Sequence, residues 1–199
     1  MPTKPTVYTF TTKNGSPVRV RPLEPEDAPY LVDLFENMGE DSRYQRFLQA
    51  LGKPEMERVW SEAEHIAGDA LIHGRGLLAF CDRTERPDVP VAAARFVELA
   101  PAQAEISISV RDDMQGTGIG TKLLGLLIDE AKIRGITQLV GLVQSDNMAM
   151  WHMLKKQGYR MTRQPDGTYT FMTLHLDQPE AQMDAAAEFS PESYLTWYK

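Results

Sequence analysis

Hydrophobic and polar positions follow two different periods along the chain, and both meet near its middle. Apolar side chains first occur at every second position, in Ile106, Ile108 and Val110, which is the pattern of a half-buried strand. After a turn that carries three glycines, apolar positions follow the helical period from Ile119 to Ala131. These residues are therefore predicted to form a strand, a glycine-rich turn and an amphipathic helix.

The remaining hydrophobic positions predict further strands and helices on both sides of this unit. Strand-like patterns, including the continuous apolar run of a buried strand at residues 77–81, predict strands over residues 7–12, 18–21, 76–82, 89–99, 138–144, 160–163 and 168–176. Helical spacing predicts helices opening at Pro25 and over residues 41–51, 56–67 and 147–157. Because a crossover helix joins the strand ending at Val110 to residues 138–144, these two strands are predicted to be parallel neighbours. The sequence therefore predicts an α/β domain built on a mixed sheet.

Length and charge limit the class of protein and of partner. With 199 residues, of which 42% are hydrophobic and 25% charged, the chain fits one globular domain with a sizeable core. Its net charge of −7 argues against nucleic acid as a partner, because phosphate binding needs clustered Lys and Arg. The same charge is compatible with cationic amine substrates.

Other features bear on the compartment. The amino end carries no apolar run of the signal-peptide type, and no stretch reaches about 18 apolar residues, so we expect no membrane span. The single cysteine, Cys81, cannot form an internal disulfide, which fits a reducing, cytoplasmic compartment. Its apolar surroundings favour a core thiol over a reactive one.

The glycine-rich turn predicts a phosphate-binding site. Gly116, Gly118 and Gly120 leave backbone N–H groups open to a ligand, and the next helix points the positive end of its dipole there. A nucleoside-triphosphate loop is excluded, because Thr121 precedes Lys122 where that motif needs Lys before Ser or Thr. A dinucleotide fingerprint counted from Gly116 also fails, because Thr121 takes the place of its third glycine.

The spacing Gln115-x-x-Gly118-x-Gly120 matches the Q-x-x-G-x-G signature of the GNAT superfamily of acyl-CoA-dependent N-acyltransferases, which this chain resembles over about residues 16–176. Residues 42–47 read S-R-Y-Q-R-F and resemble the S-x-Y-x-R-F segment of GNAT domains that acetylate protein lysines, the type that regulates acetyl-CoA synthetase. The resemblance implies the GNAT fold, which is a central, mostly antiparallel sheet with one splayed parallel strand pair and helices on both faces.

The chain is predicted to comprise a GNAT domain and a C-terminal extension. The domain covers residues 1–176, and the extension over residues 177–199 is expected to be helical and then rich in aromatic side chains. Because chain ends are usually polar and mobile, this aromatic end is predicted to pack, either on its own domain or on a partner, as in a homodimer.

The resemblance also implies acetyl-CoA as co-substrate, with no metal ion. In GNAT proteins the glycine turn cradles the pyrophosphate of coenzyme A, the pantetheine arm lies along the preceding strand, and a backbone N–H, here that of Val110, meets the oxyanion. The implied cofactor-binding residues are Ile108, Ser109, Val110, Gln115, Gly116, Thr117, Gly118, Ile119, Gly120, Thr121 and Asn147. Asn147 is also a favoured residue for capping the helix that it opens. The four histidines share no metal-ligand spacing.

Amide formation needs a neutral amine, and a lysine with a pKa near ~10.4 is neutral in only about one molecule in a thousand near pH 7.5. In the lysine acetyltransferases that this chain resembles, a glutamate at the strand position of Glu105 serves as the base. Alternatively, Glu105 is a solvated strand residue, and Glu98 on the preceding strand is the substitute base. Many GNAT enzymes have a tyrosine that protonates the departing thiolate, and Leu154 stands at that position. A thiol pKa near ~8.5 lets coenzyme A leave as a thiolate at modest cost.

The segment that walls the acceptor side in the GNAT fold carries Arg43, Tyr44 and Arg46, which we expect to contact the substrate. Alternatively, Tyr44 and Phe47 are core residues and the arginines are solvated. The resemblance implies an N-acetyltransferase acting on a primary amine, with a protein lysine as the preferred acceptor. A small-molecule amine acetyltransferase and a non-catalytic acyl-CoA sensor remain alternatives.

Overall fold

A computed structural model describes residues 8–47, 55–83 and 86–180. The expected start of the first strand at Val7 and the expected end of the second helix at Leu51 lie outside these described residues. The side chain of Phe47 and residues 181–199 of the expected C-terminal extension lie outside them as well.

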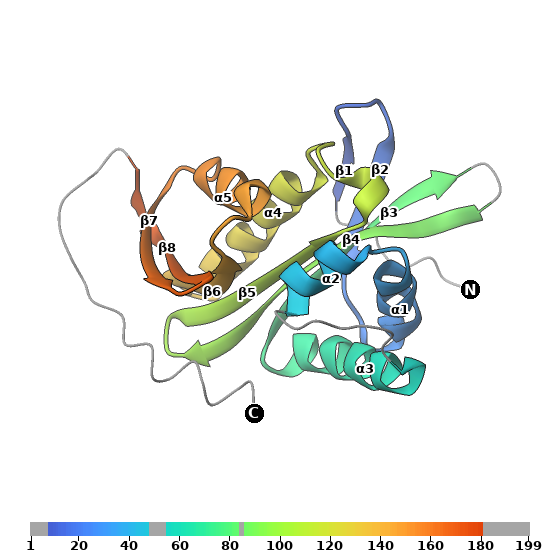
Figure 1. The fold of residues 1–199 in the computed structure, drawn as a ribbon, viewed down its shortest axis with the longest axis horizontal. Coiled ribbons are helices and arrows are strands. Elements are labelled where there is room, and N and C mark those ends of the chain that lie inside the picture. The colour runs from blue at the N-terminus through green and yellow to red at the C-terminus, as the bar shows by residue number, and fades with distance from the viewer. Residues whose placement is uncertain (1–7, 48–54, 84–85, 181–199) are drawn as a thin grey trace.

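The described strands form one sheet in the order β1-β2-β3-β4-β5-β6-β8-β7 (Figure 1). The strands are β1 (Tyr8–Thr11), β2 (Pro17–Pro22), β3 (Gly74–Arg83), β4 (Arg86–Ala100), β5 (Gln103–Val110), β6 (Gln138–Gln144), β7 (Tyr159–Asp166) and β8 (Tyr169–Pro179). The helices are α1 (Ala28–Glu36), α2 (Glu40–Phe47), α3 (Met56–Ile72), α4 (Ile119–Ile133) and α5 (Met148–Lys155), with short 3-10 turns over Pro25–Asp27 and Asp112–Met114.

The predicted mixed α/β fold with one parallel strand pair is confirmed. β5 and β6 are parallel, and the other neighbouring pairs of described strands are antiparallel. The parallel pairing is short, from Gln103 opposite Gln138 to Glu105 opposite Val140. Beyond Glu105, β5 continues beside β4 while β6 continues beside β8, so the two halves of the sheet diverge.

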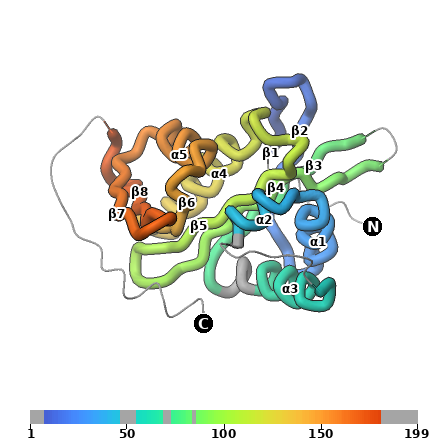
Figure 2. Tube along the Cα trace, in the orientation of Figure 1, coloured from blue at the N-terminus to red at the C-terminus, as the bar shows by residue number. Residues whose placement is uncertain are grey.

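Helices cover both faces of the sheet. Leu77 packs in the core cluster that contains the apolar side of α4 and Trp151 of α5, whereas its neighbour Leu78 packs in a second cluster with residues of α1 and α3. Successive residues of a strand point to opposite faces, so α4 and α5 lie on one face, and α1 and α3 on the other. Figure 2 shows the remaining helix, α2, lying across β4 and β5 on the side of α1 and α3.

Several elements extend beyond their predicted ends. α3 continues to Ile72, and β8 continues to Pro179, which pairs with Tyr159 of β7. The amide of Glu180 then donates to the carbonyl of Gly158, which fastens the end of this hairpin. The first residues of the expected C-terminal extension are therefore strand residues. No helix in the described part of the chain is both long and apolar enough to cross a bilayer.

Candidate active site

A cleft with a cavity volume of about 340 Å³ opens where β5 and β6 diverge. The two strands, the glycine-rich turn, α5 and α2 contribute its walls. The predicted site residues that line it are Arg46, Glu105, Ile108, Ser109, Val110, Gln115, Gly116, Gly118, Ile119, Gly120, Thr121 and Asn147. Among the predicted site residues in the described chain, Arg43, Tyr44 and Thr117 do not line the cleft.

The backbone requires glycine at two positions of the turn, whereas close packing favours it at the third. Gly116 (φ +72°) and Gly118 (φ +94°) have a left-handed backbone that residues with a Cβ rarely adopt, and Gly118 caps α4. The backbone of Gly120 is ordinary, but a Cβ there would lie 2.9 Å from the sulfur of Met153 and 3.3 Å from Cγ2 of Val110. A Cβ at Gly120 would therefore require the Met153 side chain to move, so the glycine permits the present close packing of α4 on α5 and β5. The first N–H groups of α4, which lack partners within the helix, belong to residues that line the cleft.

Thr117 shapes the turn from outside the cleft. Its hydroxyl donates to the carbonyl of Met114 at 2.6 Å, and its own carbonyl accepts from the N–H of Lys13 at 3.0 Å. The second bond holds the β1–β2 hairpin against the turn, so Lys13 lines the cleft beside Gly118. The sequence predicted this hairpin from its Asn-Gly signal, but no local pattern indicated that its tip meets the glycines.

The backbone of β5 offers hydrogen-bonding groups to the cleft. The N–H of Arg111 donates to the carbonyl of Val91 at 2.9 Å, which fixes the phase of the β4–β5 ladder. Because these bonds alternate along an antiparallel strand, the N–H and C=O groups of Ile108 and Val110 point away from β4. They face the side on which β6 has diverged, and the Val110 carbonyl already accepts from Nε2 of Gln115 at 3.3 Å.

The two candidate bases lie on opposite faces of the sheet. Glu105 is half-buried, lines the cleft and is the last residue of β5 to pair with β6. Glu98 of β4 is exposed, lies outside the cleft and accepts from Nη1 of Arg134 at 3.2 Å, just beyond the end of α4. Glu98 is in register with Ala104, whose side chain points to the face opposite that of Glu105. The register therefore leaves Glu105 as the carboxylate of the cleft.

Helix α2 is tied to the elements that border the cleft. Its Ser42 hydroxyl accepts from Nε2 of Gln115 at 3.0 Å, and its Gln45 side chain accepts from Nδ2 of Asn147 at 3.2 Å. On β5, Ser107 accepts from Nη2 of Arg46 at 3.2 Å. The helix thus contacts the glycine turn, the start of α5 and the central strand together.

Two of the predicted acceptor residues have structural partners. The Arg43 guanidinium lies 4.5 Å from the ring centroid of Phe35, and its Nε donates to the Phe35 carbonyl at 3.2 Å, so it joins α2 to the end of α1. The Tyr44 and Tyr169 hydroxyls lie 2.7 Å apart, and this hydrogen bond raises the pKa of Tyr169. Arg46 is the predicted acceptor residue that reaches the cleft.

A model of the Acetyltransferase (GNAT) family matches residues 40–159, more than half of the chain. The chain belongs to this family. It is 38% identical over 161 residues to the acetyltransferase Pat of Mycolicibacterium smegmatis, covering 78% of this chain and 45% of that protein. It is 40% identical over 83 residues to the L-amino acid N-acyltransferase MnaT of Escherichia coli, covering 37% of this chain and 48% of that protein. The chain thus spans less than half the length of these two curated relatives.

Solved structures have the same fold. The GNAT domain of S. lividans PAT superposes with a TM-score of 0.70 at 23% identity, covering 85% of this chain and 96% of that domain. The structure of yncA from Salmonella typhimurium, solved with acetyl-CoA, superposes with a TM-score of 0.55 at 23% identity over 85% of this chain and 99% of that one. At these identities the similarity establishes the fold alone, and the splayed β5–β6 pair is part of that GNAT fold.

Four further residues of this GNAT domain have structural surroundings. Asn147 lines the cleft and also caps α5, because its Oδ1 accepts from the N–H of Met150 at 3.0 Å, as predicted. Leu154 is fully buried in the core. Tyr159 packs against Lys132 beside α4 and does not line the cleft. Cys81 is buried, as predicted, and burial raises the pKa of its thiol. The described residues hold no cluster of three or more His, Cys, Asp or Glu side chains suited to a metal ion.

Proposed function

We propose that this GNAT domain transfers the acetyl group of acetyl-CoA to the side-chain amine of a protein lysine. The observation that carries the proposal is a cleft lined both by a half-buried carboxylate, Glu105 of β5, and by a glycine turn at a helix N-terminus. The turn offers partial positive charge for phosphates, and the carboxylate offers a proton acceptor. Glu105 lies on β5, whose edge is left open by the departure of β6, and the glycine turn follows the end of that strand.

The cleft suits the chemistry of coenzyme A along its whole length. The N-terminus of α4 favours the pyrophosphate, and the exposed Lys13 and Lys156 at the same cleft add positive charge. The pantetheine arm carries two amides, which can pair with the outward-facing groups of Ile108 and Val110 as an added strand would. Asn147, at the head of α5, is placed to meet the same arm through its side-chain amide.

The proposed reaction is direct attack of the amine on the thioester. Glu105 accepts a proton from the lysine ammonium, directly or through water, and the neutral nitrogen then attacks the carbonyl carbon. The oxyanion of the tetrahedral intermediate accepts from the N–H of Val110, which points into the splay between the strands. Collapse of this intermediate breaks the C–S bond and releases coenzyme A as a thiolate, and the nitrogen loses its second proton to solvent to give the neutral amide. The chain has Leu154 where an acid would stand, and a thiol pKa near ~8.5 makes this departure inexpensive.

Two observations favour a protein lysine over a small amine as the acceptor. The identity to Pat extends over 78% of the chain, whereas the identity to MnaT covers 37% of it. Residues 42–47, which resemble the lysine acetyltransferases, form most of α2, and three of them, Ser42, Gln45 and Arg46, line the cleft that contains Glu105. A small amine is the second candidate, because MnaT is named for acylation of L-amino acids.

The experiment is thiol release from acetyl-CoA by the purified chain, measured with proteins, lysine peptides, free amino acids and polyamines. Product mass spectrometry would identify the acetylated nitrogen. The proposal is supported if lysine peptides are acetylated and the Glu105→Gln variant loses this activity. Activity with free amino acids or polyamines alone would instead favour a small amine as the acceptor. Tight coenzyme A binding with no turnover for any acceptor would indicate a sensor. Cytoplasmic location and a homodimer remain predictions, the latter to be checked by light scattering of the full chain.

A further inference from the structure

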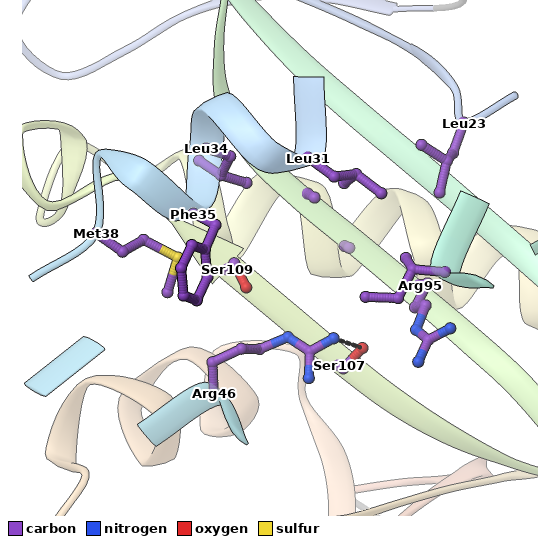
Figure 3. Close-up of a pocket in the computed structure, with 12 residues that line it drawn as sticks. Leu23, Leu31, Leu34, Phe35, Met38, Arg46, Arg95, Ser107 and Ser109 are labelled. Carbon is purple, nitrogen blue, oxygen red and sulfur yellow. Dashed lines mark hydrogen bonds between the residues drawn. The ribbon is translucent and has the colours of Figure 1, made fainter. Parts of the chain in front are cut away.

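A second arginine lies beside the proposed base. Arg95 is on β4, directly opposite Ser107 of β5, and Glu105 is two residues further along β5. Residues two apart on a strand share a face, so Arg95, Ser107 and Glu105 all point to the side covered by α2. Figure 3 shows the guanidinium of Arg46 on one side of Ser107 and that of Arg95 on the other.

Arg95 lacks the partners that a buried cation needs. Its Nη1 is buried and has no hydrogen-bond partner, and the described residues form no ion pair with this guanidinium. Arg46 differs, because it donates to Ser107. A buried donor on a charged group is costly to leave unsatisfied, and native structures rarely do so. The guanidinium therefore has a donor available for a partner other than the described residues.

A small cavity of about 50 Å³ lies beside these arginines and supplies room for that partner. Apolar side chains of α1, among them Leu31, Leu34 and Phe35, form much of its wall (Figure 3). The cavity adjoins the cleft, because Arg46 and Ser107 line both. Its volume suits a few waters or one carboxylate. The planar fork of an arginine matches a carboxylate, and apolar walls strengthen the attraction by lowering the local dielectric constant.

We propose that Arg95 binds a carboxylate of the acceptor molecule, close to the amine that Glu105 deprotonates. The inference rests on the proposed acetyl transfer and specifies its acceptors. Side chains placed diagonally across neighbouring strands, as Arg95 and Glu105 are, have Cα atoms roughly 7–8 Å apart. An acceptor that spans them carries an amine and a carboxylate within a few ångströms of each other. An acidic residue next to the reacting lysine of a protein provides this pair, and so does a free amino acid.

The test compares acceptors that differ only in the carboxylate. One pair is a lysine peptide with a neighbouring glutamate and the same peptide with glutamine, and the other is a free amino acid and its amide. We expect the wild-type chain to favour the acid in at least one pair by tenfold or more in kcat/KM. Arg95→Met should bring the acid down to the level of the amide. Arg58→Met, an exposed arginine on α3, is the matched control and should keep the preference.

Equal kcat/KM for the acid and the neutral acceptor of both pairs in the wild type would overturn the carboxylate site while leaving acetyl transfer intact. The pair that shows the preference identifies the source of the carboxylate. If no acceptor turns over, the proposed function fails, and calorimetry on the CoA-loaded protein tests the site with the glutamate and glutamine peptides and with the free amino acid and its amide. Equal affinities would then overturn it.

Arg95→Met should melt at or above the wild-type temperature, because it removes an unsatisfied buried donor. A melting temperature several degrees lower would make Arg95 a structural residue and overturn the proposal.

Discussion

Replacement of Glu105 by glutamine removes the proposed proton acceptor and keeps the length and shape of the side chain. The two side chains have the same shape, and Glu105 is half-buried on a strand paired on both sides, so the fold and the affinity for coenzyme A should persist. The carboxylate of β4 that is next to Glu105 in the register, Glu98, points to the opposite side of the sheet and pairs with Arg134. The variant therefore isolates the role of the base.

The expected loss of activity in Glu105→Gln can be calculated from the pKa of the acceptor amine. Between a lysine pKa near ~10.4 and pH 7.5 lie about 2.9 units, so a neutral amine costs about 4 kcal/mol to prepare, a factor of roughly 800. A general base typically contributes about 10²–10⁴ in rate, which brackets that cost. We expect Glu105→Gln to lose about 10²–10³ in kcat/KM for the amine at pH 7.5. At pH 9.5 the same cost falls to about 1.2 kcal/mol, so the defect should shrink to about tenfold.

The assay is thiol release over pH 7 to 10, with coenzyme A affinity measured by calorimetry and the fold by its melting temperature. Glu98→Gln is the matched control, since it makes the same substitution on the neighbouring strand and should keep the wild-type profile. A defect of constant size across this pH range would refute the role of Glu105 as a base. Wild-type turnover in Glu105→Gln would refute it more directly.

Further variants test the other parts of the site. Gly118→Asp should weaken coenzyme A binding tenfold or more in calorimetry, because it adds a negative charge beside Lys13; Gly118→Asn, with the same left-handed strain and no charge, should weaken it much less. Arg46→Ala should raise the KM for the acceptor and not for acetyl-CoA, whereas Arg43→Ala should chiefly lower the melting temperature, because that side chain holds α2 to α1. Asp27→Ala should destabilise the fold by about 3–5 kcal/mol in denaturant unfolding, because its carboxylate is 1% exposed and paired at 2.6 Å with a guanidinium.

The strand, turn and helix around the glycines could be predicted because their signals are local. Alternation in Ile106 to Val110 and the helical period after Gly118 each act over a few residues, and the crossover helix requires a parallel partner for β5. Most of the residues that the family resemblance implied for cofactor binding line one cleft. The sequence could not show why position 120 is a glycine, because the side chain that a Cβ there would meet, Met153, belongs to another helix.

Contacts that depend on register or on distant segments could not be predicted from the sequence. Whether Glu98 faces the cleft depends on its pairing with Ala104, and a shift of one residue would reverse its face. Arg95 comes opposite Ser107 through the same register, and no periodic pattern marks it. Lys13 reaches the turn through a hairpin about a hundred residues earlier in the chain. In each case the interaction joins two segments of the chain, and the sequence pattern of either segment alone does not reveal it.

The position of α2 links the proposed cofactor and acceptor sites. Gln115 and Asn147, both implied in binding coenzyme A, donate to α2 side chains, and the same helix carries Arg46 to the acceptor side. Bound coenzyme A must either leave these two hydrogen bonds intact or replace them. If it replaces them, its binding changes the contacts that hold α2 beside the acceptor. Such coupling is reciprocal, so an acceptor that shifts α2 would change the affinity for coenzyme A by the same factor. This geometry therefore favours linked rather than independent binding of the two substrates.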